Sequence, residues 1–97
     1  MLAGCGTPLP PDKREYAGTW HHTGMTLAIT PEGGVEYERM RGGTKTTISA
    51  PIRRFEGDDL VVGLPGISTT FLVQRRPYRD GADWKMVVDG VELTKTQ

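Results

Sequence analysis

Hydrophobic and polar residues alternate over short stretches through most of this chain. In the stretch 25–30, Met25, Leu27 and Ile29 alternate with small or polar residues, the pattern of a strand with one buried face. Val35 and Tyr37 alternate with glutamates in the same way. No window of about 10–12 residues keeps a helical period without a glycine or proline. The pattern therefore predicts short β-strands and no helix.

Turn residues divide the alternating stretches into about eight expected strands. Their ranges are 16–22, 25–30, 35–41, 44–55, 59–63, 67–75, 84–88 and 91–95, with a polar loop at 76–83. Asp89-Gly90 is a preferred type I′ pair, which places Val88 opposite Val91 in a two-residue hairpin. The same register places Met86 opposite Leu93 on that face.

Consecutive strands joined by tight turns favour an all-β, antiparallel up-and-down arrangement over residues 15–97. A small barrel is the leading expectation, because closure removes exposed sheet edges. A strongly twisted open meander or a sandwich is the alternative. Pro51 lies inside the stretch 44–55, so that strand is expected to lie at an edge or to bend there. The interior of a barrel with such short strands is expected to be filled by side chains.

Residues 1–14 have no regular period, and they contain Pro8, Pro10 and Pro11. Proline cannot donate a backbone hydrogen bond and favours an extended chain. This segment is expected to form a tether between the domain and whatever holds its N-terminal end.

The tetrapeptide Leu2-Ala3-Gly4-Cys5 resembles the lipobox of bacterial lipoprotein precursors. The resemblance implies that the Cys5 thiol carries diacylglycerol and that a signal peptide is cleaved just before Cys5. Two or three acyl chains hold a protein on a membrane where one would not. Such a leader needs a charged region and an apolar region upstream of Leu2. The alternative is a free, unmodified cysteine.

The same resemblance implies a location. In lipoproteins of enterobacteria-like cells, an aspartate after the modified cysteine retains the protein at the inner membrane. Gly6 is not that signal, so the expected location is the outer membrane, facing the periplasm. The membrane itself is then the first partner of this chain.

Charge and cysteine content exclude several classes of function. Twelve basic and twelve acidic residues give a formal net charge of zero, which disfavours general nucleic-acid binding. A single cysteine forbids an internal disulfide bond. The sequence indicates no cofactor.

Gly18-Thr19-Trp20 resembles the Gly-x-Trp that opens the first strand of lipocalin and lipocalin-like barrels. Many small bacterial lipoproteins of lipocalin-like type share this start, followed by a similar rhythm of strands and turns. The resemblance implies that Trp20 closes one end of the barrel by packing, and it allows a small apolar ligand inside. We expect Trp20 to be a core residue rather than a ligand contact.

Six other residues are candidates for binding a ligand or partner. A basic loop contains Arg75, Arg76, Tyr78 and Arg79, and it would suit an anionic glycan, a lipid head group or an acidic partner. The alternative is an ordinary solvated loop. Arg39 follows Tyr37 on the apolar face of its strand, so it lies either at the barrel rim or inside as a polar ligand contact. Tyr37 would line the same interior.

The sequence contains little that indicates a catalytic or metal-binding site. His21 and His22 are adjacent on an expected strand and point to opposite faces, so they cannot share one metal ion. Neither serine of the chain lies in a nucleophile elbow, and Asp58-Asp59 reads as a turn. We therefore expect no catalytic residues and no metal ligands.

These observations together predict a lipid-anchored protein of the bacterial cell envelope that acts as a binding or interaction module, with an envelope protein as its partner. A small-ligand carrier is one alternative. An inhibitor of a cell-wall hydrolase is another, although the disulfide typical of such inhibitors is absent. An enzyme is the least favoured alternative.

Overall fold

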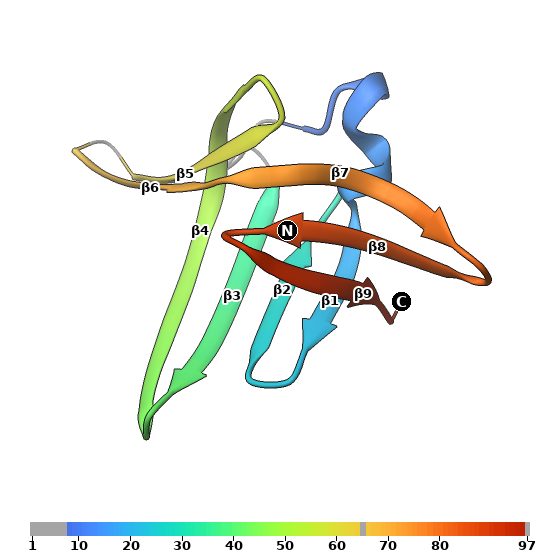
Figure 1. The fold of residues 1–97 in the computed structure, drawn as a ribbon. Helices are drawn as coiled ribbons and strands as arrows, with labels where there is room; N and C mark the ends of the chain where they lie inside the picture. The colour runs from blue at the N-terminus through green and yellow to red at the C-terminus, as the bar shows by residue number, and fades with distance from the viewer. Residues whose placement is uncertain (1–7, 65, 97) are drawn as a thin grey trace.

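The computed structural model describes residues 8–64 and 66–96, and of Leu64 only the backbone. A short 3-10 helix opens the described chain, and antiparallel strands make up most of the rest (Figure 1). The elements are η1 (Pro11–Tyr16), β1 (Gly18–His22), β2 (Met25–Ile29), β3 (Gly34–Arg41), β4 (Thr44–Glu56), β5 (Asp59–Leu64), β6 (Ile67–Phe71), β7 (Val73–Asp80), β8 (Asp83–Val88) and β9 (Val91–Lys95). The all-β prediction is confirmed.

The strands form one curled, barrel-like sheet in up-and-down order. Hydrogen-bonded neighbours follow the order β6-β5-β4-β3-β2-β1-β9-β8-β7. Every strand thus pairs with a neighbour in the sequence, except that β1 also pairs with β9. The two ends of the order, β6 and β7, follow one another along the chain across Leu72, and this run crosses in front of β1–β4 in Figure 1. The sheet therefore curls back on itself.

Two local predictions are confirmed in detail. Val88 pairs with Val91 and Met86 with Leu93, and Asp89 and Gly90 have φ values of 50° and 80°, as a type I′ turn requires. The bend predicted near Pro51 is also present. β4 pairs with β3 as far as Pro51 and with β5 from Ile52 onward, where the register shifts.

The prediction for residues 67–83 is wrong in two respects. The stretch 67–75 is two strands separated at Leu72, and residues 76–80 continue β7 instead of forming a loop. The register of β7 against β8 shifts between Val73 and Arg75 and again before Tyr78. These irregularities break the alternation of polar and apolar positions, so the segment does not look like a strand in the sequence.

The N-terminal segment is packed from Leu9 onward, where a tether was expected. Leu9 is buried, and its N–H donates to the carbonyl of Pro31 at 3.1 Å. Pro11 starts η1 at a position that suits proline, because the first N–H groups of a helix have no partner within it. Tyr16, expected in the first strand, ends η1 and is fully buried. Two apolar side chains thus hold this proline-rich segment on the sheet.

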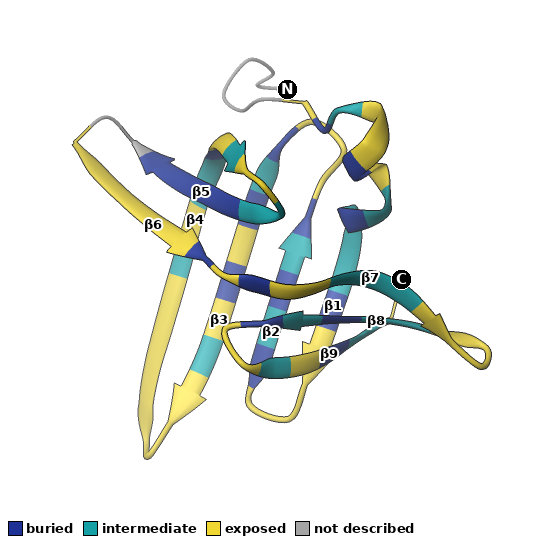
Figure 2. Ribbon diagram, turned by 45° about the horizontal axis from the view of Figure 1, so that its top comes forward, coloured by how far each residue is buried: buried dark blue, intermediate teal, exposed yellow. Residues whose placement is uncertain are grey.

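Side chains fill the interior between the front and back of the curled sheet. Buried positions, dark blue in Figure 2, line the inner side of β1, β2, β3 and β8. The rings of Tyr37 and Phe71 meet across the interior with centroids 5.0 Å apart. Among the described residues, no buried side-chain polar atom lacks a hydrogen bond. The filled core predicted for a small barrel is present in this curled, open sheet.

Candidate functional site

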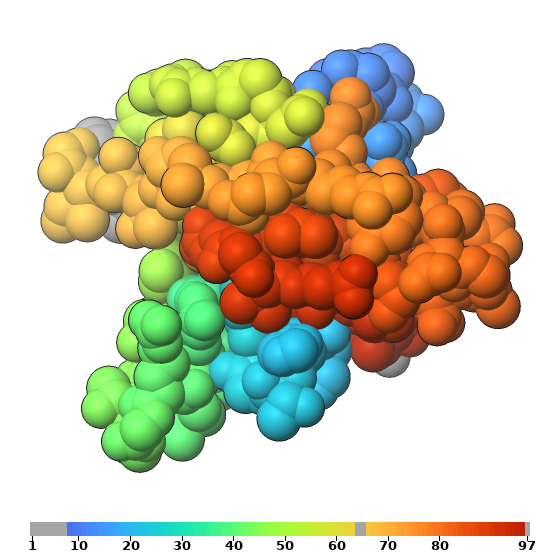
Figure 3. All heavy atoms as spheres, in the orientation of Figure 1, coloured from blue at the N-terminus to red at the C-terminus, as the bar shows by residue number. Residues whose placement is uncertain are grey.

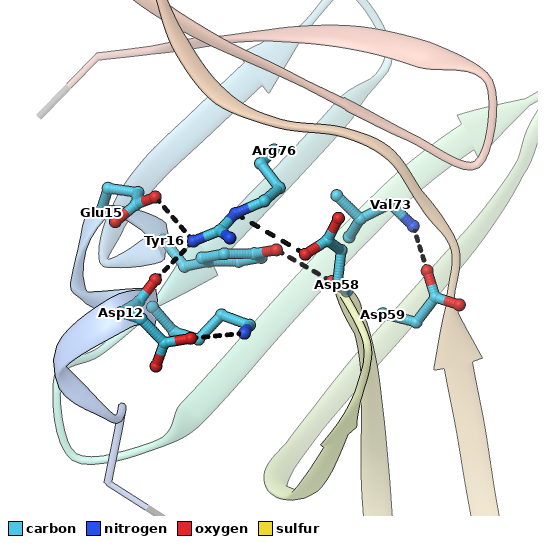
Figure 4. Close-up of polar contacts among 8 residues, drawn as sticks. Asp12, Glu15, Tyr16, Asp58, Asp59, Val73 and Arg76 are labelled. Atoms are coloured by element: carbon cyan, nitrogen blue, oxygen red, sulfur yellow. Dashed lines mark hydrogen bonds and ion pairs between the residues drawn. The ribbon is translucent and has the colours of Figure 1, made fainter.

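Arg76, one of the four residues of the predicted basic loop, holds η1 against the sheet (Figure 4). One guanidinium nitrogen, Nη2, donates to Glu15 Oε2 at 3.0 Å and also to the carbonyl of Asp12. Nε lies 3.6 Å from Asp58 Oδ1, in the turn between β4 and β5. Arg76 therefore ties three distant segments together, which is a structural role.

Tyr16 lies beneath Arg76 and completes this junction. Its hydroxyl donates to the carbonyl of Asp58 at 2.9 Å, and its ring packs edge-on against Phe55 at 5.5 Å. Burial raises the pKa of Tyr16 above its usual value of about 10, and the charge of Asp58 adds to this. The tyrosine is therefore a neutral hydrogen-bond donor throughout the physiological range.

The raised pKa of Tyr16 makes the domain sensitive to alkali. Below about pH 10 the phenol is protonated in both states. Above it the unfolded chain loses this proton first, so the free energy of unfolding falls by up to about 1.4 kcal/mol per pH unit until the folded pKa is reached. We expect urea titrations between pH 8 and 11.5 to show that the free energy of unfolding falls less steeply with pH in Tyr16→Phe than in the wild type. At pH 8 the variant is expected to be the less stable of the two. Equal slopes in the two proteins would contradict this account.

Arg75 and Tyr78 lie together on the outer face of β7–β9. The Arg75 guanidinium carbon is 3.6 Å from the centroid of the Tyr78 ring, a close cation–π contact. The Tyr78 hydroxyl donates to Glu92 Oε2 at 2.5 Å, and this hydrogen bond raises the pKa of Tyr78. The cation and the carboxylate thus already have partners within the molecule.

Arg79 lies apart from both groups, near the turn between β7 and β8. Its guanidinium is 5.6 Å from the Trp84 ring, and it donates to the carbonyl of Gly81. The four residues predicted to form one basic loop are therefore divided among three places. Their sequence proximity indicated a single patch, but a strand with register shifts sends neighbouring side chains in different directions.

Trp20 and Tyr37 are core residues. Trp20 is fully buried, and its indole N–H donates to the carbonyl of Tyr16 at 2.9 Å. Tyr37 is 7% exposed and packs on Phe71. Both side chains are therefore parts of the core, and Tyr37 is also among the residues that line the groove on β2–β4 described below. Arg39 lies opposite Met25 and Thr46, half-buried at the level where the core ends and β3 continues.

The residues considered for catalysis or metal binding have structural contacts. Asp59 Oδ1 accepts the N–H of Val73 at 2.8 Å, which fixes the start of β7. His21 Nδ1 lies 3.3 Å from the Thr26 hydroxyl on an exposed face. Across residues 8–64 and 66–96, no cluster of three or more histidine, cysteine or acidic side chains could hold a metal ion.

An open groove on the outer face of β2–β4 was not anticipated from the sequence. Its volume is about 200 Å³, and the side chains that line it include two glutamates and three hydroxyl groups, from Thr26, Ala28, Glu36, Glu38, Thr47 and Ser49. Glu38 is paired with Lys45 at 2.7 Å. The small side chain of Ala28 among larger neighbours is the only sequence signal for this hollow.

The groove adjoins a free sheet edge. Residues 44–51 of β4 pair with β3 on one side, and within the described chain no strand pairs with them on the other. In Figure 2 this half of β4 is mostly exposed, and it forms a hairpin with the end of β3 that projects from the body. An edge of this kind presents unpaired backbone groups to another chain.

Cys5, the predicted site of lipid attachment, lies outside the described residues. Among the residues described, no helix has the length and apolar character needed to cross a bilayer. Comparisons with family models, with curated proteins and with solved structures gave no match.

Proposed function

We propose that this protein is a binding module of the bacterial cell envelope, anchored by lipid on Cys5 to the outer membrane and facing the periplasm. The observation that supports a binding surface over a carrier is the filled interior. Trp20, Leu27, Phe71 and Met86 occupy the space that a ligand would need. Contacts with an envelope protein would therefore be made by the loops, the outer faces and the sheet edge.

The packed N-terminal segment would give the anchored domain a defined orientation. Leu9 is held at the end of the sheet that carries η1 and the turn around Pro31. The four residues from Gly6 to Leu9 span at most about 14 Å when fully extended. A lipid on Cys5 would hold this end close to the bilayer, while the β3–β4 turn at the other end would point away.

The lipid anchor is tested by analysing the product of the natural gene expressed in a bacterial host. The expected result is that the protein partitions with the membrane fraction and that the mass of its N-terminal peptide shows two or three acyl chains on Cys5. A Cys5→Ser variant should be neither acylated nor cleaved at this site. A bare Cys5 thiol in a protein recovered from the soluble fraction would overturn the proposal.

A further inference from the structure

The free edge of β4 has three residues whose backbone groups point away from the molecule. The N–H of Ile52 donates to the carbonyl of Gly33 at 2.7 Å. In an antiparallel ladder, alternate residues direct both backbone groups to the same side, so Thr46 and Ile48 also bond to β3. Lys45, Thr47 and Ser49 then direct their N–H and C=O groups outward. This is a continuous run of hydrogen-bonding groups.

Pro51 and the register shift after it limit the free edge at one end, but between Thr44 and Ala50 little protects it from pairing. Natural edge strands are blunted by charges, prolines or bulges. Between Thr44 and Ala50 the one charged residue is Lys45, and its ammonium group is paired with Glu38. In Figure 3 the β3–β4 hairpin projects at the lower left, beside β1 and β2, and no other segment covers its left side, so an incoming strand has access there.

The charges beside the edge indicate what kind of strand fits. Arg39 and Arg41 lie on the inner face of β3, opposite Thr46 and Thr44 of β4. Within the described part of the chain neither arginine forms an ion pair. A strand added to β4 lies two strand spacings, roughly 10 Å, from β3. Acidic side chains opposite Thr44 and Thr46 can meet the long arginine side chains across that distance.

We propose that the edge at residues 44–50 captures an extended acidic segment of a partner protein by antiparallel β-strand addition. Backbone hydrogen bonds to Lys45, Thr47 and Ser49 hold the segment, and carboxylates on its inner face pair with Arg39 and Arg41. An apolar residue of the segment packs against Ile48. This inference names the partner chemistry of the proposed binding module.

A second copy of this chain fits the edge less well. Antiparallel pairing of two β4 edges places Ile48 and Ala50 opposite Thr46 and Thr44, so Arg39 and Arg41 gain no carboxylate partner. The reversal also places the η1 ends of the two copies at opposite ends of the paired strands. With the short span from Cys5 to Leu9, both copies would not reach one membrane. This last argument rests on the proposed lipid anchor.

The test uses the full chain carrying Cys5→Ser, in solution, and the capped peptide Val-Thr-Val-Thr-Glu-Thr-Glu. Its two glutamates fall opposite Thr46 and Thr44. Saturating peptide should slow hydrogen exchange at the amides of Lys45, Thr47 and Ser49 at least tenfold, and leave Thr46 and Ile48, already bonded to β3, unchanged. The same peptide N-methylated at its second, fourth and sixth residues should not bind. Lysine in place of both glutamates should weaken binding at least tenfold.

Protein variants give an independent measurement. Thr47→Pro, at an outward-facing N–H where proline is tolerated, should reduce peptide affinity at least tenfold, whereas Thr47→Val should not. Equal binding of the N-methylated peptide, or no protection at the three amides, would overturn the proposal. Protection of these amides without peptide, in a concentration-dependent dimer, would assign the edge to a second copy instead. The Cys5→Ser variant used in this test carries no lipid. A bare Cys5 thiol in the membrane experiment would therefore overturn the lipid anchor without affecting the result for peptide binding.

Discussion

Trp20→Ala is expected to lose about 3–5 kcal/mol in free energy of unfolding, because it removes the largest fully buried side chain. The change leaves a cavity in the core and deprives the carbonyl of Tyr16 of the indole N–H. A domain of this size has a total stability near the low end of about 5–15 kcal/mol. Urea denaturation, followed by circular dichroism, should show a midpoint at much lower urea than in the wild type, with a substantial part of the variant unfolded even without urea.

Trp84→Ala is the matched control for this change. Trp84 is the other tryptophan, and it is only half-buried, beside Arg79. Its replacement removes the same number of atoms but creates no enclosed cavity, so we expect a loss of about 1–2 kcal/mol. Similar losses in the two variants would contradict the placement of Trp20 at the centre of the core.

Gly63→Ala is expected to be comparably damaging, for a backbone reason. Gly63 has a φ of 140°, and a Cβ at this position would lie 2.2 Å from the carbonyl oxygen of Ile67 and 2.7 Å from Ser68 Cα. Ser68 is the cross-strand partner of Gly63 between β5 and β6. Unfavourable φ and overpacking each cost about 1–3 kcal/mol. Thermal unfolding should show a melting temperature lower by at least about 12 °C.

Gly57→Ala separates the steric contact from the conformational cost. Gly57 also has positive φ, at 65°, but a Cβ there meets nothing within 4 Å. We expect it to cost about 1–2 kcal/mol, the usual penalty of a left-handed conformation for alanine. If Gly63→Ala were no worse than Gly57→Ala, then β5 and β6 would not approach as closely as described.

The parts of the fold that the sequence predicted are those set by local chemistry. The Asp89-Gly90 turn fixes its hairpin, because a two-residue loop leaves one register for the flanking strands. Pro51 marked the bend in β4 correctly because it lacks an N–H, and β4 changes partner directly after it. These signals need no knowledge of the rest of the chain.

The parts that the sequence did not predict depend on distant contacts. The proline-rich start appeared unstructured, yet Leu9 and Tyr16 pack on a sheet that forms only later in the chain. Arg76 looked like a member of a basic patch, but Glu15 and Asp58, which bind it, lie far away in sequence. The break at Leu72 arises because Asp59 and Asp89 accept hydrogen bonds from Val73 and Leu72.

The candidate site likewise has features that the local sequence predicted and features that depend on distant contacts. Arg39 was singled out from its strand pattern, and the structure places it beside the free edge. Pro51 predicted that its strand lies at an edge or bends, and residues 44–51 of β4 do form a free edge. That this edge lies beside Arg39 and Arg41 was not predicted, because strand pairing is a property of the sheet as a whole. Cys5 was identified by a motif alone, and its modification remains a prediction.

The pairing of β1 with β9 sets when this domain can fold. Trp20 aligns with Lys95 and His21 with Thr94, and the N–H of Thr96 donates to the carbonyl of Thr19. β9, which joins β8 and β7 to the rest of the sheet, is thus the last of the described strands to be synthesised. Until β9 has emerged from the ribosome or from a translocation channel, the chain cannot make this contact, and its β1 keeps an open edge. Folding of this domain is therefore completed only once β9 has emerged and paired with β1.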